Sequence, residues 1–256
     1  MTDEPHPPSG VSPAPTASPE LDAWLRRAVA TTPGKLLGSG YQASVLLYSG
    51  PWGDVVVKQP HESVVFGALW RRLIRREHDV YTRLRGIPGI PRSFGLIDGR
   101  YLALEYVAGP SLRTHEGQLA EREGFFAALL ATVRAMHAAG VAHGDLKRKN
   151  NIVVGAGERP YIVDFGIATR HDDASASRLG RLWFDHAKQA DYNAWVKLKY
   201  GRRIDPADVA EVLSPADAEL YRPLWTERLA RAIRVPWQKI TLRRPRQRWR
   251  KRRDGE

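Results

Sequence analysis

Residues 143–150 read His-Gly-Asp-Leu-Lys-Arg-Lys-Asn, and the apolar triplet Ile152-Val153-Val154 follows them closely. Within the first segment, Asp145 and Asn150 stand on a loop between a predicted helix and a predicted short strand. Another β-type run ends in Asp164-Phe165-Gly166. A carboxylate that can accept a proton, an amide oxygen and a second carboxylate therefore occur in this order beside short strands. Such oxygen groups suit a hard cation like Mg²⁺.

A glycine-bearing loop and a strand lysine precede these segments. The loop Gly38-Ser39-Gly40-Tyr41-Gln42-Ala43-Ser44-Val45 lies between two β-type runs, although Ala43 replaces the third glycine of a G-x-G-x-x-G pattern. Its glycines allow backbone N–H groups to approach a polyphosphate. The run Val55-Val56-Val57 then ends in Lys58, and Glu77 follows on a predicted helix. Taken singly, these features also fit a plain turn, a solvent-facing lysine and a surface glutamate.

Together the segments match the requirements of phosphoryl transfer. The reaction needs the phosphates to be held, metal ions to be placed, and an acceptor hydroxyl to be oriented and deprotonated. Each requirement has a candidate group, and the groups follow one another in the order found in kinases.

Over roughly residues 35–168, these motifs resemble the protein-kinase-like superfamily. The resemblance implies ATP and Mg²⁺ as cofactors, with Asp145 as the catalytic base and Lys147 in contact with the transferred phosphate. It implies that Lys58, paired with Glu77, holds the α- and β-phosphates, and that Asn150 and Asp164 bind Mg²⁺. Leu104-Glu105-Tyr106-Val107 resembles the hinge whose backbone binds adenine. The implied nucleotide-binding positions are Gly38, Gly40, Val45, Lys58, Glu77, Glu105 and Val107. His143 is expected to be a packing residue.

Two departures from ordinary protein kinases stand out. Gly144 occupies the place where regulated kinases carry an arginine that pairs with a phosphorylated loop, so switching by that route is not expected. No Ala-Pro-Glu motif follows Gly166. The compact His-Gly-Asp pattern resembles the RIO-type and bacterial lipopolysaccharide-kinase-type branches. We therefore expect a hydroxyl acceptor of the Kdo or heptose sugar type. The alternatives are a RIO-like serine/threonine protein kinase and, from another class, a non-catalytic nucleotide-binding scaffold.

The periodicity predicts an α+β, two-lobed, protein-kinase-like fold. A small antiparallel β N-lobe with one main helix would span about 30–107, and a mostly helical, shortened C-lobe about 108–238. Asp98-Gly99 marks a hairpin turn. Pairs of an N-cap residue and a proline open two late helices. The predicted helices are 21–29, 64–84, 117–137, 176–200 and segments starting at Asp205-Pro206 and Ser214-Pro215.

Composition restricts the class of protein and its surroundings. The 256 residues include no cysteine, which excludes disulfides and thiolate chemistry. No apolar run is long enough to span a bilayer. The Pro-rich leader 1–20 is expected to be disordered and shows no secretory signal. Much of the net charge of +12 lies in the basic tail 239–256, whose expected partner is an anionic membrane surface or nucleic acid. A solvated charge run is the alternative. We expect a cytoplasmic protein, peripheral at the inner face of the membrane if the tail binds lipid.

Overall fold

The computed structural model describes residues 18–39, 43–61, 67–171, 177–201, 204 and 209–224. The chain divides into two compact units, Met1–Arg202 and Arg203–Glu256, and every cavity residue discussed below belongs to the first. Several predicted features lie outside the described residues: Gly40, most of the leader, residues 64–66 and 176 at the starts of two predicted helices, the helix start at Asp205-Pro206 and the basic tail.

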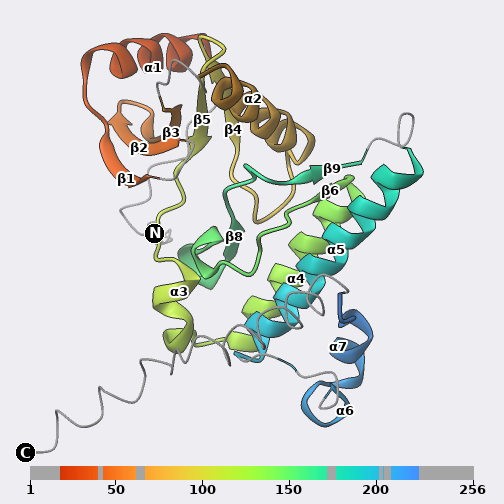
Figure 1. The fold of residues 1–256 in the computed structure, drawn as a ribbon. Coiled ribbons are helices and arrows are strands. Elements are labelled where there is room, and N and C mark those ends of the chain that lie inside the picture. The colour runs from red at the N-terminus through yellow and green to blue at the C-terminus, as the bar shows by residue number, and fades with distance from the viewer. Residues whose placement is uncertain are drawn as a thin grey trace, which may run out of the picture. The chain divides into compact units, whose positions relative to one another are not determined.

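A five-stranded antiparallel sheet forms the first half of the larger unit (Figure 1). Its spatial order is β1-β2-β3-β5-β4. The strands are β1 (Lys35–Ser39), β2 (Ala43–Gly50), β3 (Gly53–Pro60), β4 (Ser93–Ile97) and β5 (Tyr101–Glu105). Asp98 and Gly99 both have positive φ, 51° and 63°. This backbone twist matches that of the strands it joins, which is why Asp-Gly favours a tight hairpin. The predicted antiparallel sheet is confirmed.

Two helices cover opposite faces of this sheet. Successive strand residues point to opposite faces: Val55 and Val57 pack in one buried cluster with Leu21 and Leu25 of α1 (Pro19–Thr31). The opposite face of the sheet carries Lys58, which contacts Glu77 of α2 (Gly67–Arg83). One main helix was predicted for this half of the unit. The packing of α1 on the sheet was not predicted from the sequence. Ser18 caps α1 by accepting a hydrogen bond from the Leu21 N–H.

Replacing Leu25 by alanine tests the contribution of α1 to the core. The side chain is 2% exposed in the cluster, so its loss leaves a cavity. We expect the free energy of unfolding to fall by about 2–5 kcal/mol, measured by urea denaturation. Arg27→Ala, at an exposed position of the same helix, should change it by no more than about 0.5 kcal/mol. Equal effects of the two substitutions would contradict the packing role.

The second half of the larger unit is built around two long helices, α4 (Arg122–Ala138) and α5 (Arg178–Lys199), which lie side by side (Figure 1). The two short strands predicted at 152–154 and 161–163 are present as β7 (Ile152–Val154) and β8 (Pro160–Ile162), and the structure pairs them with each other. A second pair, β6 (Val141–Ala142) with β9 (Thr169–Arg170), has no sequence prediction behind it. The remaining elements are α3 (Leu112–His115), η1 (Glu116–Gln118), η2 (Lys149–Asn151) and η3 (Ala156–Glu158). Sheet followed by helices confirms the α+β, two-lobed kinase-like prediction.

One helix boundary was wrong. The predicted helix 117–137 begins only at Arg122, because a side chain from another part of the chain binds the backbone just before it. The carboxylate of Glu158 accepts hydrogen bonds from the N–H groups of Ala120 and Glu121. These bonds lower the pKa of Glu158, since they favour its charged form. The helix end was predicted well: α4 stops at Ala138, and Gly140 follows with φ of 74°.

The smaller unit contributes α6 (Val209–Val212) and α7 (Pro215–Leu220). Ser214 caps α7 and Pro215 is its first residue, as predicted. Within the same unit, the Tyr221 hydroxyl donates to the carbonyl of Ile204. Across all the described residues, we find no helix long and apolar enough to traverse a membrane.

Candidate active site

A cavity of about 450 Å³ brings the predicted site residues together. The sheet contributes apolar walls, among them Val45 and Leu104, and the second half of the unit contributes Val153 and Ile167. This size and mixed lining are typical of small-molecule sites. The polar residues at the cavity are Lys58, Glu77, Glu105, Asp145, Arg148, Asn150, Asn151 and Asp164.

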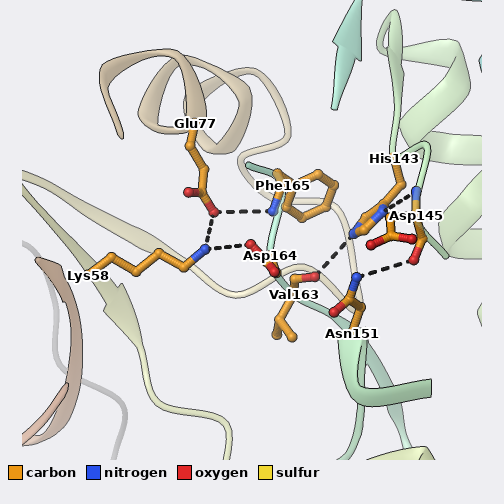
Figure 2. Close-up of polar contacts among 8 residues, drawn as sticks. All are labelled: Lys58, Glu77, His143, Asp145, Asn151, Val163, Asp164 and Phe165. Atoms are coloured by element: carbon orange, nitrogen blue, oxygen red, sulfur yellow. Dashed lines mark hydrogen bonds and ion pairs between the residues drawn. The ribbon is translucent and has the colours of Figure 1, made fainter. Parts of the chain in front are cut away.

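A buried lysine lies between two carboxylates at this cavity (Figure 2). The Lys58 Nζ is 2.6 Å from Glu77 Oε1 and 2.8 Å from Asp164 Oδ1. Glu77 Oε1 also accepts the N–H of Phe165 at 3.1 Å. One glutamate of α2 therefore ties strand β3 to the Asp164-Phe165-Gly166 segment.

Charge pairing outweighs burial in this network. Burial alone would lower the pKa of Lys58, but the neighbouring Glu77 and Asp164 raise it above its usual value. Burial alone would likewise raise the pKa of Asp164, yet the charge and hydrogen bond of Lys58 lower it. Both groups are therefore charged at neutral pH. Asp164 also has φ of 68°, a left-handed conformation uncommon for a residue with a Cβ and often found at functional sites.

Three rings in contact with one another connect α2 with the loop that carries Asp145. Tyr81 meets Phe165 edge-on with ring centroids 5.1 Å apart, and Phe165 lies 4.9 Å from the ring of His143. All three side chains are buried. Burial, followed by the charge of Glu77, raises the pKa of the Tyr81 phenol, so this ring stays neutral. Edge-to-face contacts of this kind add stability beyond the area they bury.

His143 is a packing residue, as the resemblance implied. Its Nδ1 accepts the N–H of Asp145 at 3.2 Å, and its Nε2 lies 3.1 Å from the carbonyl oxygen of Val163. The two contacts assign the neutral tautomer with its proton on Nε2, which donates to that carbonyl. The side chain of Asn151 donates to the Asp145 carbonyl. The loop around Asp145 is thus held from both sides (Figure 2).

The predicted catalytic and metal-binding residues take different positions around this loop. The Asp145 side chain is only 14% exposed, borders the cavity and lies 3.2 Å from the Nε of Arg148. Asn150 and Asp164 border the same cavity. Lys147 is exposed and is not part of the cavity lining. The structure therefore brings Asp145, Asn150 and Asp164 together and leaves Lys147 at the surface.

One residue that supports the site, Asp191 of α5, was not among the site residues predicted from the sequence. Its fully buried carboxylate accepts the N–H groups of His143 at 2.7 Å and Gly144 at 2.9 Å. It also lies 3.0 Å from His137 Nε2. Gly144 has φ of 78°, a conformation that glycine adopts readily. Asp191 follows the buried Ala187 by one helical turn, and a carboxylate on an apolar helix face is the signal that could have revealed it.

Removing the Asp191 carboxylate should loosen the Asp145 loop. Asp191→Ala leaves two amides without acceptors, each at a cost of about 1–3 kcal/mol. We expect a comparable loss of unfolding free energy and faster hydrogen exchange at the amides of His143 and Gly144. Asp185→Ala removes an exposed carboxylate of the same helix, paired with Lys188, and should cost less than about 1 kcal/mol. Unchanged exchange in Asp191→Ala would contradict the anchoring role.

The predicted nucleotide-binding residues divide into three groups. Val45, Lys58, Glu77, Glu105 and Val107 border the cavity. Gly38 pairs with Val45 across the strands but is not part of the lining. Gly40 lies outside the described residues.

The two hinge residues differ in the backbone groups they can offer a ligand. The Glu105 N–H already donates to the carbonyl of Arg92 at 2.8 Å, so only its carbonyl could serve a ligand. Val107 lies past the end of β5, and within the described ranges its amide has no partner.

The oxygen groups at the cavity fit a magnesium ion. Asn150 and Asp164 supply an amide and a carboxylate oxygen, which are hard donors. In the described part of the chain, no group of three or more His, Cys, Asp or Glu side chains is placed to hold a metal alone. Two protein ligands suit Mg²⁺, which usually keeps several waters and shares substrate phosphates.

Comparison with known proteins supports the same family. The family model described as the protein kinase domain matches residues 32–186. The chain is 32% identical over 133 residues to serine/threonine-protein kinase PknE of Mycobacterium tuberculosis, covering 49% of this chain and 23% of that protein. It is 30% identical over 167 residues to the probable serine/threonine-protein kinase PkwA of Thermomonospora curvata, covering 60% and 22%.

A relative named for a different function matches a stretch of similar length. The probable bifunctional tRNA threonylcarbamoyladenosine biosynthesis protein of Methanosarcina acetivorans is 30% identical over 163 residues, 60% of this chain and 27% of that protein. The matches span less than a third of the length of each of these three relatives. The family model, in contrast, covers more than half of the chain. With a kinase-type order of motifs and the Lys58–Glu77–Asp164 network at one cavity, this chain belongs to the protein kinase domain family.

Proposed function

We propose that the protein transfers the γ-phosphate of ATP to a serine or threonine hydroxyl of a protein acceptor. The observation that carries this proposal is the convergence of Lys58, Glu77, Asp145, Asn150 and Asp164 at one cavity. The two relatives that are named serine/threonine-protein kinases support a protein as the phosphate acceptor. The lipopolysaccharide-type sugar and the RIO or lipopolysaccharide branch receive no such support, so the alternative of the sequence analysis replaces them.

The nucleotide would bind in the apolar part of the cavity. Val45, Leu104 and Val153 offer surfaces for adenine, and the free amide of Val107 can donate a hydrogen bond to it. The Glu105 carbonyl is the corresponding acceptor. Lys58, held in place by Glu77, would contact the phosphates at the inner end.

The acceptor hydroxyl would meet Asp145. This carboxylate borders the cavity, and its backbone is held by His143 and Asn151. Asp145 would orient the hydroxyl and take up its proton. Mg²⁺ bound by Asn150 and Asp164 would neutralise charge on the transferred phosphoryl group. Lys147, although at the surface, would reach the phosphoryl group through its long side chain.

Asp145→Asn tests the proposed reaction. The amide keeps the shape of the side chain but cannot accept the proton, so turnover should fall about a hundredfold or more. ATP binding should persist. Phosphate transfer from labelled ATP to a protein fraction measures the first quantity and thermal shift the second. Asp22→Asn, on α1 away from the cavity, should behave as the unchanged protein. If the unchanged protein binds ATP but transfers nothing, the non-catalytic scaffold replaces the kinase.

Asp164→Ala tests the proposed metal position. ATP at about a hundred times its Kd should stabilise the unchanged protein by about 2.7 kcal/mol, with most of this gain requiring Mg²⁺. The variant should lose the magnesium-dependent part, because a hard cation loses a charged oxygen ligand. Lys58→Ala should retain magnesium dependence and lower turnover. Thermal-shift titrations with and without Mg²⁺ measure the magnesium dependence of both variants, and phosphate transfer from labelled ATP measures their turnover. A magnesium response that survives in Asp164→Ala would contradict the assignment.

The organisation of the chain remains part of this proposal. We propose a kinase-like domain at 21–238, with lobes meeting near residue 107, just after β5 ends at Glu105. The Pro-rich leader 1–20 and the basic tail 239–256 would flank it. The charge of the tail supports an anionic membrane surface or nucleic acid as its partner.

A further inference from the structure

The Asp145 carboxylate already has a cationic partner on its own loop. Arg148 Nε lies 3.2 Å from Asp145 Oδ2, and both residues border the cavity. The Arg148 side chain is 68% exposed, whereas that of Asp145 is 14% exposed. The guanidinium therefore reaches in from the solvent side and contacts Oδ2, one of the two oxygen atoms that an incoming hydroxyl could use.

Arg148 retains donors for a second anion. Its contact with Asp145 uses Nε, and within the part of the chain that the structure describes Asp145 is its only ion-pair partner. The two terminal nitrogens can therefore bind a carboxylate in the paired geometry that arginine favours. An ion pair with so exposed a cation contributes little stability, so an exchange of partners costs little.

The charges around Arg148 do not cancel its positive charge at the place where the acceptor would bind. Lys149, the next residue, pairs with Glu116 and is neutralised. Lys147, the preceding residue, is exposed. Glu116, which also pairs with Arg122, has no ion pair with Arg148 among the described residues, so the loop presents the positive charge of Arg148 beside Asp145.

We propose that Arg148 forms an anion-binding subsite for the acceptor and selects serine or threonine hydroxyls flanked by acidic side chains. This inference rests on the proposed protein kinase function. A glutamate or aspartate of the acceptor takes the guanidinium from Asp145, which frees the Asp145 oxygen for the hydroxyl. A neutral acceptor leaves Arg148 on Asp145 and must compete with it. Arg148 therefore affects how well an acceptor hydroxyl is placed at Asp145, and it does not affect the binding of ATP.

Matched peptides test this subsite. Three peptides share one serine and differ only in its neighbours, which are glutamate, glutamine or arginine. For the unchanged protein we expect kcat/KM to be about tenfold higher with glutamate than with glutamine neighbours, as for a charge-assisted hydrogen bond. Arg148→Gln should reduce this ratio of kcat/KM values to about one, and Arg148→Lys should give an intermediate ratio. Arg134→Gln, an exposed arginine of α4 outside the cavity lining, should keep all of it.

The outcomes separate this inference from the function on which it rests. ATP-dependent thermal shifts confirm that each variant is folded and binds nucleotide. If the peptides are phosphorylated but Arg148→Gln keeps the preference for glutamate, the subsite is wrong and the kinase function stands. The subsite is equally wrong if the unchanged protein phosphorylates the three peptides without preference. Transfer to no peptide, or only to a phosphorylated sugar, would overturn the protein acceptor and this subsite together.

Discussion

The buried ammonium group of Lys58 is the constraint on which the arrangement of this protein depends. A charge removed from water is costly unless opposite charges and hydrogen bonds compensate it. Lys58 is 8% exposed and obtains its compensation from two separate segments, α2 through Glu77 and the segment that follows β8 through Asp164. Helix, sheet and catalytic segment must therefore meet at one point. The cavity exists beside that meeting point.

The buried carboxylate of Asp191 plays a corresponding role for the loop that carries Asp145. Asp191 accepts the amides of His143 and Gly144, and so joins α5 to the loop of Asp145. The contacting rings of Tyr81, Phe165 and His143 connect the Lys58 network with the loop that Asp191 holds. Groups that touch the reactants are thus held by groups that do not, which is how a site keeps its geometry. The exception is Arg148, whose exposed pairing with Asp145 is free to change partners.

Much of the sheet and of the site's chemistry could be predicted because both depend on local pattern. Runs of β-branched residues such as Val55-Val56-Val57 and the Asp98-Gly99 turn indicate the strands and a hairpin, and the order of Lys58, Asp145 and Asp164 indicates the reaction. The start of α4 could not be predicted, because Glu158 holds the preceding backbone from a distant loop. The pair β6–β9 joins strands of two residues, too short for any periodic signal.

The sequence by itself determined which chemical groups this protein has, in what order, and where the chain turns. Those properties reside in single residues and short runs. Only the tertiary structure decided which polar groups meet: Lys58 and Asp164 are 106 positions apart, and Asp191 lies 47 positions from Gly144. The physical reason is that ion pairs and hydrogen bonds over such separations form only when packed helices and strands bring their atoms within a few ångströms. No spacing along the chain encodes that approach.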